Sequence, residues 1–425
     1  MDEEKIIERL RFHNDWWVTG RVAPVLTYSF RRDIYTKIIS YLNLNRVVLL
    51  KGPRRTGKST IFYQLIEELI TKRGVDPKNI LYLTFDDPML RTDLFELLKL
   101  YEKISGQSLN QQPQKYIFLD EVHFLPDWAA TVKIFYDKKL PLKIFGSGSS
   151  ASLLIKQSEN LGGRTIEETI FPLSFSEWKR YHGGTRSLFG QGEEMVFKNY
   201  LEHSGFMHLL NIPEKELWTK MLVEDIVTKA IYKDAVQIFG IREPAVLEKM
   251  FSYLAASTAG LVNVSKLSGM LGIERVQTTN YLTFLENSLL VFPLQKYSRQ
   301  IRESLRSQEK IHLTDQGFGQ VYSSPSGAIL ESVVARHLLE KYPRKTYFWR
   351  EKYEVDLVIE EKDKLIPIEV KESSKVGERE LIGLVEFTRE FKQKEAKVIY
   401  FGKKRTEKYG NLVVDFIPAW EFLTS

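Results

Sequence analysis

One eight-residue segment constrains the fold of this chain more than any other feature. It reads Gly52-Pro53-Arg54-Arg55-Thr56-Gly57-Lys58-Ser59 and fits the pattern G-x-x-x-x-G-K-[ST] at every fixed position. The apolar run before it, 46–52, predicts a buried parallel strand, and residues 59–74 after it predict a helix. Glycines and backbone amides in such a strand–loop–helix unit wrap phosphate groups, so the segment predicts a nucleotide-binding loop.

The residue types of this loop predict its chemistry. The Lys58 ammonium is expected to reach the β- and γ-phosphates, and the Ser59 hydroxyl is expected to hold Mg²⁺. The predicted nucleotide-binding residues are Gly52, Pro53, Arg54, Arg55, Thr56, Gly57, Lys58, Ser59 and Thr60. The alternative, an ordinary glycine turn, does not explain why the loop joins an apolar strand to a helix.

Carboxylates end a second apolar run, 116–121. Asp120 is predicted to bind Mg²⁺ through its water shell, and Glu121 to polarise the attacking water. Ser147 ends the next run, 142–147, where it either senses the γ-phosphate or makes a turn hydrogen bond. Arg164 is predicted as an arginine finger, acting within the chain or from a neighbouring copy; an exposed loop arginine is the alternative.

Composition limits the class of protein. The chain has 425 residues, which predicts about three domains, and its 43% hydrophobic content is sufficient for several cores. No cysteine is present, which excludes disulfides, thiolate metal sites and cysteine nucleophiles. The charged start and the lack of a long apolar run predict no signal peptide, no membrane partner and a cytoplasmic location. The net charge of +6 permits nucleic acid as a partner without arguing for it.

The order of predicted elements separates three modules. Strands at 46–52, 80–87, 116–121 and 142–147, with helices between them, predict an α/β fold with a parallel sheet. Helices then dominate, and 244–288 followed by a β-wing at 289–298 has the order of a winged helix–turn–helix. A helix from 329, several strands and a further helix predict a second α/β unit.

Charged residues in this last unit predict a second site. Strand alternation places Glu369 and Lys371 on one face, where Asp356 and Glu369 could bind Mg²⁺ while Lys371 stabilises charge at a phosphate. Glu331 on the preceding helix adds a third oxygen ligand. The alternative is a solvated ladder of ion pairs. The segment resembles metal-dependent nucleases of the PD-(D/E)XK type, and the resemblance implies a nuclease-like fold that either cleaves nucleic acid or serves only for binding.

The winged helix predicts contact with DNA. Its second helix carries polar residues suited to groove or phosphate contacts, namely Arg275, Gln277, Thr278, Thr279 and Asn280. The segment after it is basic, with Lys296, Arg299, Arg302, Arg306 and Lys310. The same spacing also suits a solvated helix face, and a winged helix can serve only for packing or subunit contact.

The segments GPRRTGKST and FLDEVHFLPDW together resemble the AAA+ superfamily. More narrowly, the chain resembles a family of archaeal and bacterial predicted ATPases that join an AAA+ core to a winged helix and a restriction-endonuclease-like domain of unknown function. Further landmarks of that family are FGSGSS, FPLSFSEW, NYLTFLENSLLVFPL, EKIHLTDQGF, EVDLVI and IPIEVK, over roughly residues 20–400. The chain departs from the family at 204–207, which reads SGFM where GGFP is usual. The resemblance implies ATP as the nucleotide.

These observations predict an AAA+-like P-loop ATPase domain at 1–180, a helical linker with a winged helix at 181–310, and a nuclease-like α/β domain at 311–425. The predicted function is ATP binding and hydrolysis with Mg²⁺, in a protein that acts on DNA. The alternative is a nucleotide-operated switch or signalling ATPase whose C-terminal fold only binds a partner. The sequence leaves open whether the chain forms a homo-oligomer.

Overall fold

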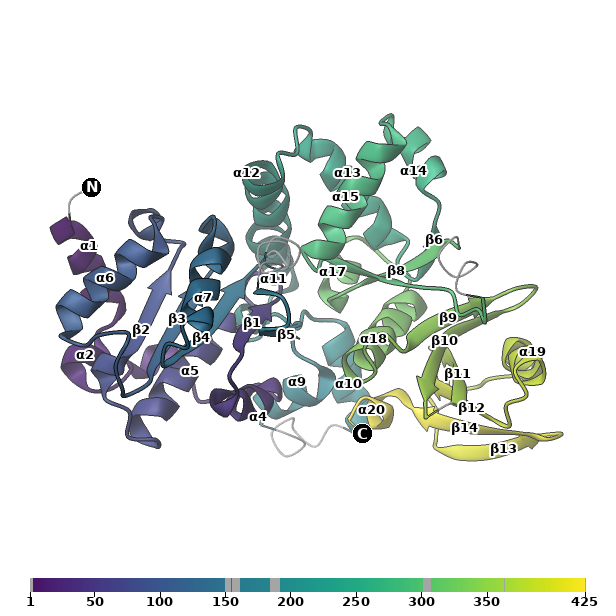
Figure 1. Cartoon of the computed structure of the whole chain (residues 1–425). Coiled ribbons are helices and arrows are strands. Elements are labelled where there is room, and N and C mark those ends of the chain that lie inside the picture. The colour runs from purple at the N-terminus through teal and green to yellow at the C-terminus, as the bar shows by residue number, and fades with distance from the viewer. Residues whose placement is uncertain are drawn as a thin grey trace. The chain divides into compact units, whose positions relative to one another are not determined.

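A computed structural model of the chain describes residues 3–149, 154, 161–183, 192–300, 307–362 and 364–424. The chain divides into two compact units, Met1–Phe171 and Pro172–Ser425, and Figure 1 labels their elements. Among the described residues, no helix combines the length and the apolar character that crossing a bilayer requires.

The first unit is built on a parallel sheet of five strands in the order β2-β3-β4-β1-β5. The strands are β1 (Val47–Lys51), β2 (Ile80–Thr84), β3 (Lys115–Asp120), β4 (Leu142–Gly148) and β5 (Thr165–Thr169). The helices are α1 (Glu3–His13), α2 (Trp16–Thr19), α3 (Pro24–Thr27), α4 (Ile34–Ser40), α5 (Lys58–Thr71), α6 (Leu94–Ser105) and α7 (Trp128–Asp137). The predicted α/β fold with a parallel sheet is confirmed.

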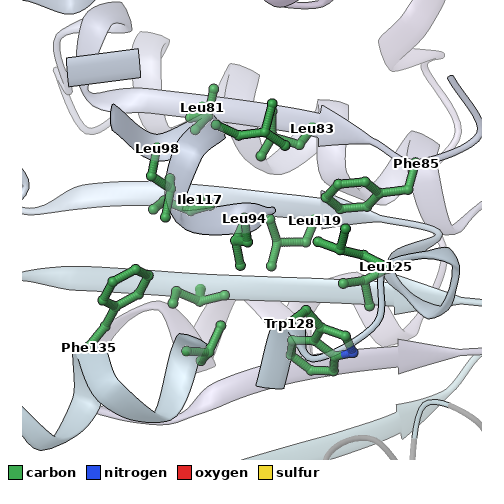
Figure 2. Close-up of a cluster of buried hydrophobic side chains, with 14 of the residues drawn as sticks. Leu81, Leu83, Phe85, Leu94, Leu98, Ile117, Leu119, Leu125, Trp128 and Phe135 are labelled. Carbon is green, nitrogen blue, oxygen red and sulfur yellow. The ribbon is translucent and has the colours of Figure 1, made fainter. Parts of the chain in front are cut away.

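Both faces of this sheet are covered, because alternate residues of each strand point to opposite sides. Val48 and Leu50 pack with the apolar side of α5, whereas Leu49 belongs to the cluster formed with α6 and α7. Figure 2 shows the cluster on the side of α6 and α7, which includes Leu119 of β3 and Trp128 of α7. Burial on both faces explains why the central strands appear in the sequence as continuous apolar runs.

The edge strand β5 was not predicted. It carries Glu167 and Glu168, and its side chains are half-buried or exposed, so it lacks the apolar run of the inner strands. It pairs in parallel with β1, from Val47 opposite Thr165 to Lys51 opposite Thr169. The end of β5 therefore lies beside the end of β1, where the predicted nucleotide loop begins.

The second unit begins with helices that pack around a small sheet. These elements are α9 (Phe175–Tyr181), α10 (Glu193–Leu201), α11 (Lys215–Leu222), the π-helical segment η8 (Val223–Asp234), α12 (Ala235–Phe239), α13 (Pro244–Ala256), β6 (Gly260–Val262), α14 (Val264–Leu271), α15 (Arg275–Asn287), β7 (Val291–Leu294), β8 (Glu309–Leu313) and α17 (Gln316–Val321). The sheet has the order β6-β8-β7 and is antiparallel. Strand β8 crosses residue 310, the predicted domain limit. The three predicted helices of 244–288 are present, and the winged-helix assignment stays a prediction.

The rest of the second unit is a mixed sheet of six strands in the order β13-β14-β12-β11-β10-β9. Its elements are α18 (Ser326–Lys341), β9 (Thr346–Arg350), β10 (Glu354–Glu361), β11 (Lys364–Lys371), α19 (Ile382–Glu390), β12 (Glu395–Tyr400), β13 (Arg405–Tyr409), β14 (Leu412–Pro418) and α20 (Ala419–Phe422). Strands β10 and β11 form an antiparallel hairpin, as expected for 354–371, and β11 pairs in parallel with β12. A second α/β unit is therefore present, and its nuclease-like character stays a prediction.

Candidate functional site

The loop Gly52–Gly57 connects the end of β1 to the first turn of α5, as its sequence predicts. Gly57 has φ +93°, a backbone conformation that residues with a Cβ rarely adopt. A Cβ on Gly52 would lie 2.3 Å from the carbonyl oxygen of Ile170 at the end of β5. Glycine at these two positions therefore lets the loop turn tightly against its neighbouring strand.

Two buried cations fix this loop. The Arg32 guanidinium donates from Nη1 to the Thr56 carbonyl and from Nη2 to the Phe171 carbonyl, each at 2.9 Å. The Lys58 ammonium donates to the carbonyls of Gly52 and Pro53, also at 2.9 Å. The Lys58 charge thus lies over the loop at the N-terminal end of α5, where backbone N–H groups favour anions.

The remaining predicted nucleotide-binding residues lie along the same loop and the first turn of α5. The Thr56 hydroxyl is buried and donates to the Pro53 carbonyl at 2.9 Å. Arg54 is half-buried and Arg55 is exposed, and both belong to the loop itself. Thr60 is half-buried in α5. The structure therefore brings all nine predicted residues to one end of the sheet.

Asp120 lies at the end of β3, next to this loop. Its Oδ2 accepts hydrogen bonds from Ser59 Oγ at 2.5 Å and from Tyr82 OH at 2.6 Å, and its Oδ1 accepts one from Ser147 Oγ. Burial raises the pKa of Asp120 and the Glu121 carboxylate raises it further, whereas the three hydroxyls lower it. The contact between the Ser59 hydroxyl and the Asp120 carboxylate joins the two residues that were predicted to bind Mg²⁺.

Glu121 directly follows Asp120, and three neighbouring residues contact it. Its N–H donates to Ser147 Oγ at 3.2 Å, and its Oε2 accepts from the Ser149 N–H at 3.0 Å. His123 Nδ1 lies 3.3 Å from the same Oε2, with the imidazole fully buried. Glu121 adopts a left-handed backbone conformation with φ +50°, which turns its side chain out of the line of β3. The predicted base is therefore positioned by the loop after β4 and by His123.

The topology explains why these residues meet. Strands β1, β3 and β4 are parallel, with Leu50 opposite Ser147 and Leu119 opposite Gly146. Their carboxyl ends consequently share one edge, which is where ligands bind in open α/β sheets (Figure 1). Ser59 and Asp120 present two oxygen donors side by side, the kind that Mg²⁺ prefers, so the residues present fit that ion.

Arg164 lies away from this site within the chain, and its role as an arginine finger stays a prediction. The Val47 N–H, at the start of β1, donates to the Arg164 carbonyl at 2.9 Å. Arg164 is thus at the opposite end of the strands from Gly52, roughly 15 Å away for five residues of strand. Its guanidinium pairs with Asp137 at 2.9 Å beside a cavity of about 580 Å³. Because the strands are parallel, a residue that precedes β5 cannot reach the loop that follows β1.

The second unit brings together the charged residues that were predicted for the C-terminal site. Lys371 Nζ lies 2.5 Å from Glu369 Oε1 and 3.8 Å from Asp356 Oδ2 across the β10–β11 hairpin. The Val370 N–H donates to Asp356 Oδ2 at 2.9 Å. Burial, followed by the Asp356 carboxylate, raises the pKa of Glu369 to about 8. Alternation therefore places Glu369 and Lys371 on one face, as expected.

Glu331, the predicted third ligand, is paired with a lysine from another element. Lys310 Nζ lies 2.8 Å from Glu331 Oε1 and 2.6 Å from Glu354 Oε1, and the lysine is buried. Burial alone would lower the pKa of Lys310, but the surrounding carboxylates outweigh it and raise the pKa. Burial, then the Asp356 carboxylate, raises the pKa of Glu331 to about 8. We call Glu331, Glu354, Asp356 and Glu369, with Lys310 and Lys371, the C-terminal cluster.

The C-terminal cluster differs from the predicted metal site. In the part of the chain that the structure describes, no group of three or more histidine or carboxylate side chains is arranged to hold a metal ion. Two of the predicted ligands are paired with lysines, Glu331 with Lys310 and Glu369 with Lys371. Glu331, Asp356 and Glu369 therefore belong to an ion-pair network with Lys310 and Lys371, and their assignment as metal ligands stays a prediction.

The predicted DNA-contacting residues are only partly exposed. On α15, Arg275, Thr279 and Asn280 are exposed, but Thr278 is buried and donates to the Glu274 carbonyl at 2.9 Å. The Gln277 amide is occupied by two hydrogen bonds within the unit.

In the basic segment after α15, the described basic side chains contact other groups of the second unit. Lys296 Nζ pairs with Glu351 at 2.5 Å, Arg299 lies over the Phe391 ring, and Lys310 is buried in the C-terminal cluster. Arg302 and Arg306 lie outside the described residues.

Sequence reasoning did not place four residues at these sites that the geometry brings there. They are Arg32, Tyr82, His123 and Lys310. Tyr82 is a hydroxyl in an otherwise apolar strand, and His123 follows the carboxylate pair by two residues, so both carried a weak signal. The other two reach their sites from distant segments, and no local pattern indicates them.

Three protein-family models match consecutive segments of the chain. Residues 44–179 match an AAA domain, 196–324 match a domain of unknown function (DUF8612), and 326–422 match another (DUF4143). The AAA match covers the sheet, the loop after β1 and the carboxylates after β3. This part of the chain is therefore an AAA-type P-loop ATPase domain. The other two matches assign no activity to the second unit.

Three relatives are similar to this chain over most of their own length. A protein of Haemophilus influenzae is 25% identical over 359 residues, covering 80% of this chain and 86% of that protein. A protein of Methanocaldococcus jannaschii is 26% identical over 421 residues, covering 92% and 90%. One of Mycobacterium tuberculosis is 24% identical over 379 residues, covering 84% and 76%. All three are described as uncharacterized, and the similarity extends beyond the AAA domain.

Two solved structures resemble parts of the chain. The Walker-type ATPase of Pyrococcus abyssi has a TM-score of 0.43 at 15% identity and covers 69% of this chain and 96% of its own. AMPPCP-bound DnaA from Aquifex aeolicus has a TM-score of 0.31 at 14% identity, with 60% and 86% covered.

Proposed function

We propose that the first unit binds ATP with Mg²⁺ and hydrolyses it. The single observation that supports this most is the contact of Ser59 with Asp120 at 2.5 Å, with Glu121 held beside it. Lys58 and the loop amides would bind the phosphates, and Ser59 and Asp120 would hold Mg²⁺, which supplies charge neutralisation when bound. Glu121 would orient a water and take its proton.

Nucleotide binding tests this assignment. Lys58→Ala removes the ammonium at the loop, and we expect it to abolish binding of a fluorescent ATP analogue in the presence of Mg²⁺. Lys99→Ala on α6 is the matched control, because that lysine side chain is 53% exposed and pairs only within its helix. Equal binding by both variants would refute the site. Competition by ATP and GTP decides which base is preferred.

We further propose that Arg164, if it serves as an arginine finger, acts from a neighbouring copy of the chain. The observation behind this is its position at the amino ends of the strands, on the opposite edge from Gly52. An Arg164→Ala protein mixed with a Glu121→Gln protein tests it. Recovery of ATP turnover in the mixture is expected, because each copy would supply what the other lacks. Turnover equal to that of the separate variants would contradict action between copies.

Two roles for the second unit are proposed, and the lysine contacts favour one of them. Because Lys310 and Lys371 pair with the carboxylates, the C-terminal fold is better suited to binding a partner in a nucleotide-operated switch than to Mg²⁺-dependent cleavage. If the protein with Mg²⁺ or Mn²⁺ nicked DNA or RNA and Lys371→Ala protein did not, the nuclease role would replace the switch.

Action on DNA is a separate proposal, which the exposed side chains of Arg275, Thr279 and Asn280 on α15 support. A mobility shift of duplex DNA that weakens with salt, together with stimulation of ATP turnover, is the expected result. Arg275→Ala should reduce the shift, whereas Arg344→Ala, an exposed arginine after α18, is the matched control. Lack of any shift at low salt would remove DNA as a partner.

A further inference from the structure

Lys310 of the second unit is a buried lysine whose ammonium group is surrounded by carboxylates. Its side chain is only 3% exposed, and its ammonium contacts carboxylates of two elements other than its own strand β8. One is Glu331 of α18 at 2.8 Å, and the other is Glu354 of β10 at 2.6 Å. A single ammonium therefore links the three-stranded sheet to the helix and the hairpin of the C-terminal fold.

The balance of charge around it is negative. The C-terminal cluster holds four carboxylates against the ammonium groups of Lys310 and Lys371 and the Arg350 guanidinium, which lies 3.3 Å from Glu354 Oε2. Carboxylates out of water are stable only when cations or hydrogen-bond donors compensate them. One oxygen is left over, because the buried Oε2 of Glu369 has no hydrogen-bond partner among the described residues. The cluster thus has more acceptor capacity than its two lysines use.

These contacts explain why the carboxylates do not form a metal site as the chain is folded. A divalent ion needs several oxygen ligands directed at one point. Glu331 and Glu354 are instead directed at Lys310. Removing that ammonium would leave the buried Glu331 without its lysine, whereas Glu354 would keep the Arg350 guanidinium of β9 at 3.3 Å from its Oε2. The cluster would become one charge more negative.

We propose that Lys310 is the built-in cation of the C-terminal cluster, holding Glu331 and Glu354 where a divalent metal ion would otherwise bind. A neutral side chain at this position converts the cluster into a divalent-cation site. The proposal concerns the second unit alone and does not depend on ATP hydrolysis by the first.

Titration of the full chain with Mn²⁺ tests this proposal, with Mn²⁺ itself as the probe and no nucleotide present. We expect Lys310→Met to bind Mn²⁺ at least about tenfold more tightly than the wild type, because the buried Glu331 carboxylate, then without its lysine, favours a new cation. Lys310→Arg keeps the charge and should behave as the wild type. Lys364→Met, an exposed lysine of the same hairpin, controls for loss of a lysine elsewhere.

The double variant Lys310→Met/Glu369→Gln assigns the new site, since it should lose the gained binding. Equal Mn²⁺ binding by Lys310→Met and wild type, or a gain that survives Glu369→Gln, would overturn the proposal. Thermal unfolding covers the case in which Lys310→Met is unstable. In that case Mn²⁺ should raise the Tm of Lys310→Met but not that of Lys310→Arg. A Tm of Lys310→Met that Mn²⁺ leaves unchanged would also overturn the proposal.

Discussion

The exchange of Arg32 for methionine tests how the nucleotide loop is held. The Arg32 guanidinium is buried and bridges the Thr56 carbonyl in the loop to the Phe171 carbonyl after β5. Methionine fills much of the same volume but donates no hydrogen bond. Each buried carbonyl left without a partner costs about 1–3 kcal/mol, so two cost about 2–6 kcal/mol.

This cost should appear as local opening of the loop. A loss of about 2 kcal/mol corresponds to roughly 30-fold faster exchange of protected amides. Hydrogen–deuterium exchange of peptides that cover residues 52–60, read by mass spectrometry, measures it. We also expect weaker ATP binding, because the loop amides that wrap the phosphates are less well fixed.

The neighbouring Arg31 supplies the control. Its side chain is 41% exposed and pairs with Glu68 at 3.4 Å, so Arg31→Met should cost about 0–1 kcal/mol and speed exchange less than about fivefold. If loop exchange in Arg32→Met equalled that in Arg31→Met, the bridge would not hold the loop, and the reasoning from buried carbonyls would be refuted.

Three further predictions concern positioning, pH and stability. His123→Phe keeps the ring volume but removes Nδ1 from Glu121, so ATP turnover should fall while ATP affinity stays unchanged; a matching fall in affinity would argue against a positioning role. Burial raises the pKa of Glu286 from 4.5 to about 7, so the folded protein binds the extra proton and stability should fall, by on the order of 3 kcal/mol, as pH rises from about 4.5 through 7. Glu286→Gln should flatten that pH profile of the Tm, and an unchanged profile would contradict the assignment. Arg336 is buried and donates to two carbonyls and a tyrosine hydroxyl, so Arg336→Met should destabilise the second unit by about 3–5 kcal/mol in urea unfolding, whereas the exposed Arg344→Met should have almost no effect.

The sequence indicates where the candidate nucleotide site lies because its signals are local. The glycines and Lys58 lie within one loop, and Asp120 and Glu121 follow directly on a buried strand. In a parallel sheet, strand ends share one edge, so the meeting of these residues follows from the order of strands and helices. Ser147 could be placed in the same way.

Features that depend on strand order or long-range contacts were not predictable. β5 was missed because an edge strand with Glu167 and Glu168 lacks an apolar run. The position of Arg164 could not be predicted, because nothing in its neighbourhood shows that β5 begins beside the start of β1. Lys310 was assigned to a basic, exposed segment, although tertiary contacts bury it beside Glu331.

ATP turnover by Glu121→Gln protein, with ATP affinity measured on the same sample, tests the central claim most directly. Glutamine keeps the size of the side chain but cannot take a proton from water. The account predicts that turnover with Mg²⁺ falls at least about 100-fold while affinity for ATP is retained. Turnover at the wild-type rate in this variant, or no ATP hydrolysis by the wild type under any Mg²⁺ concentration, would contradict the account.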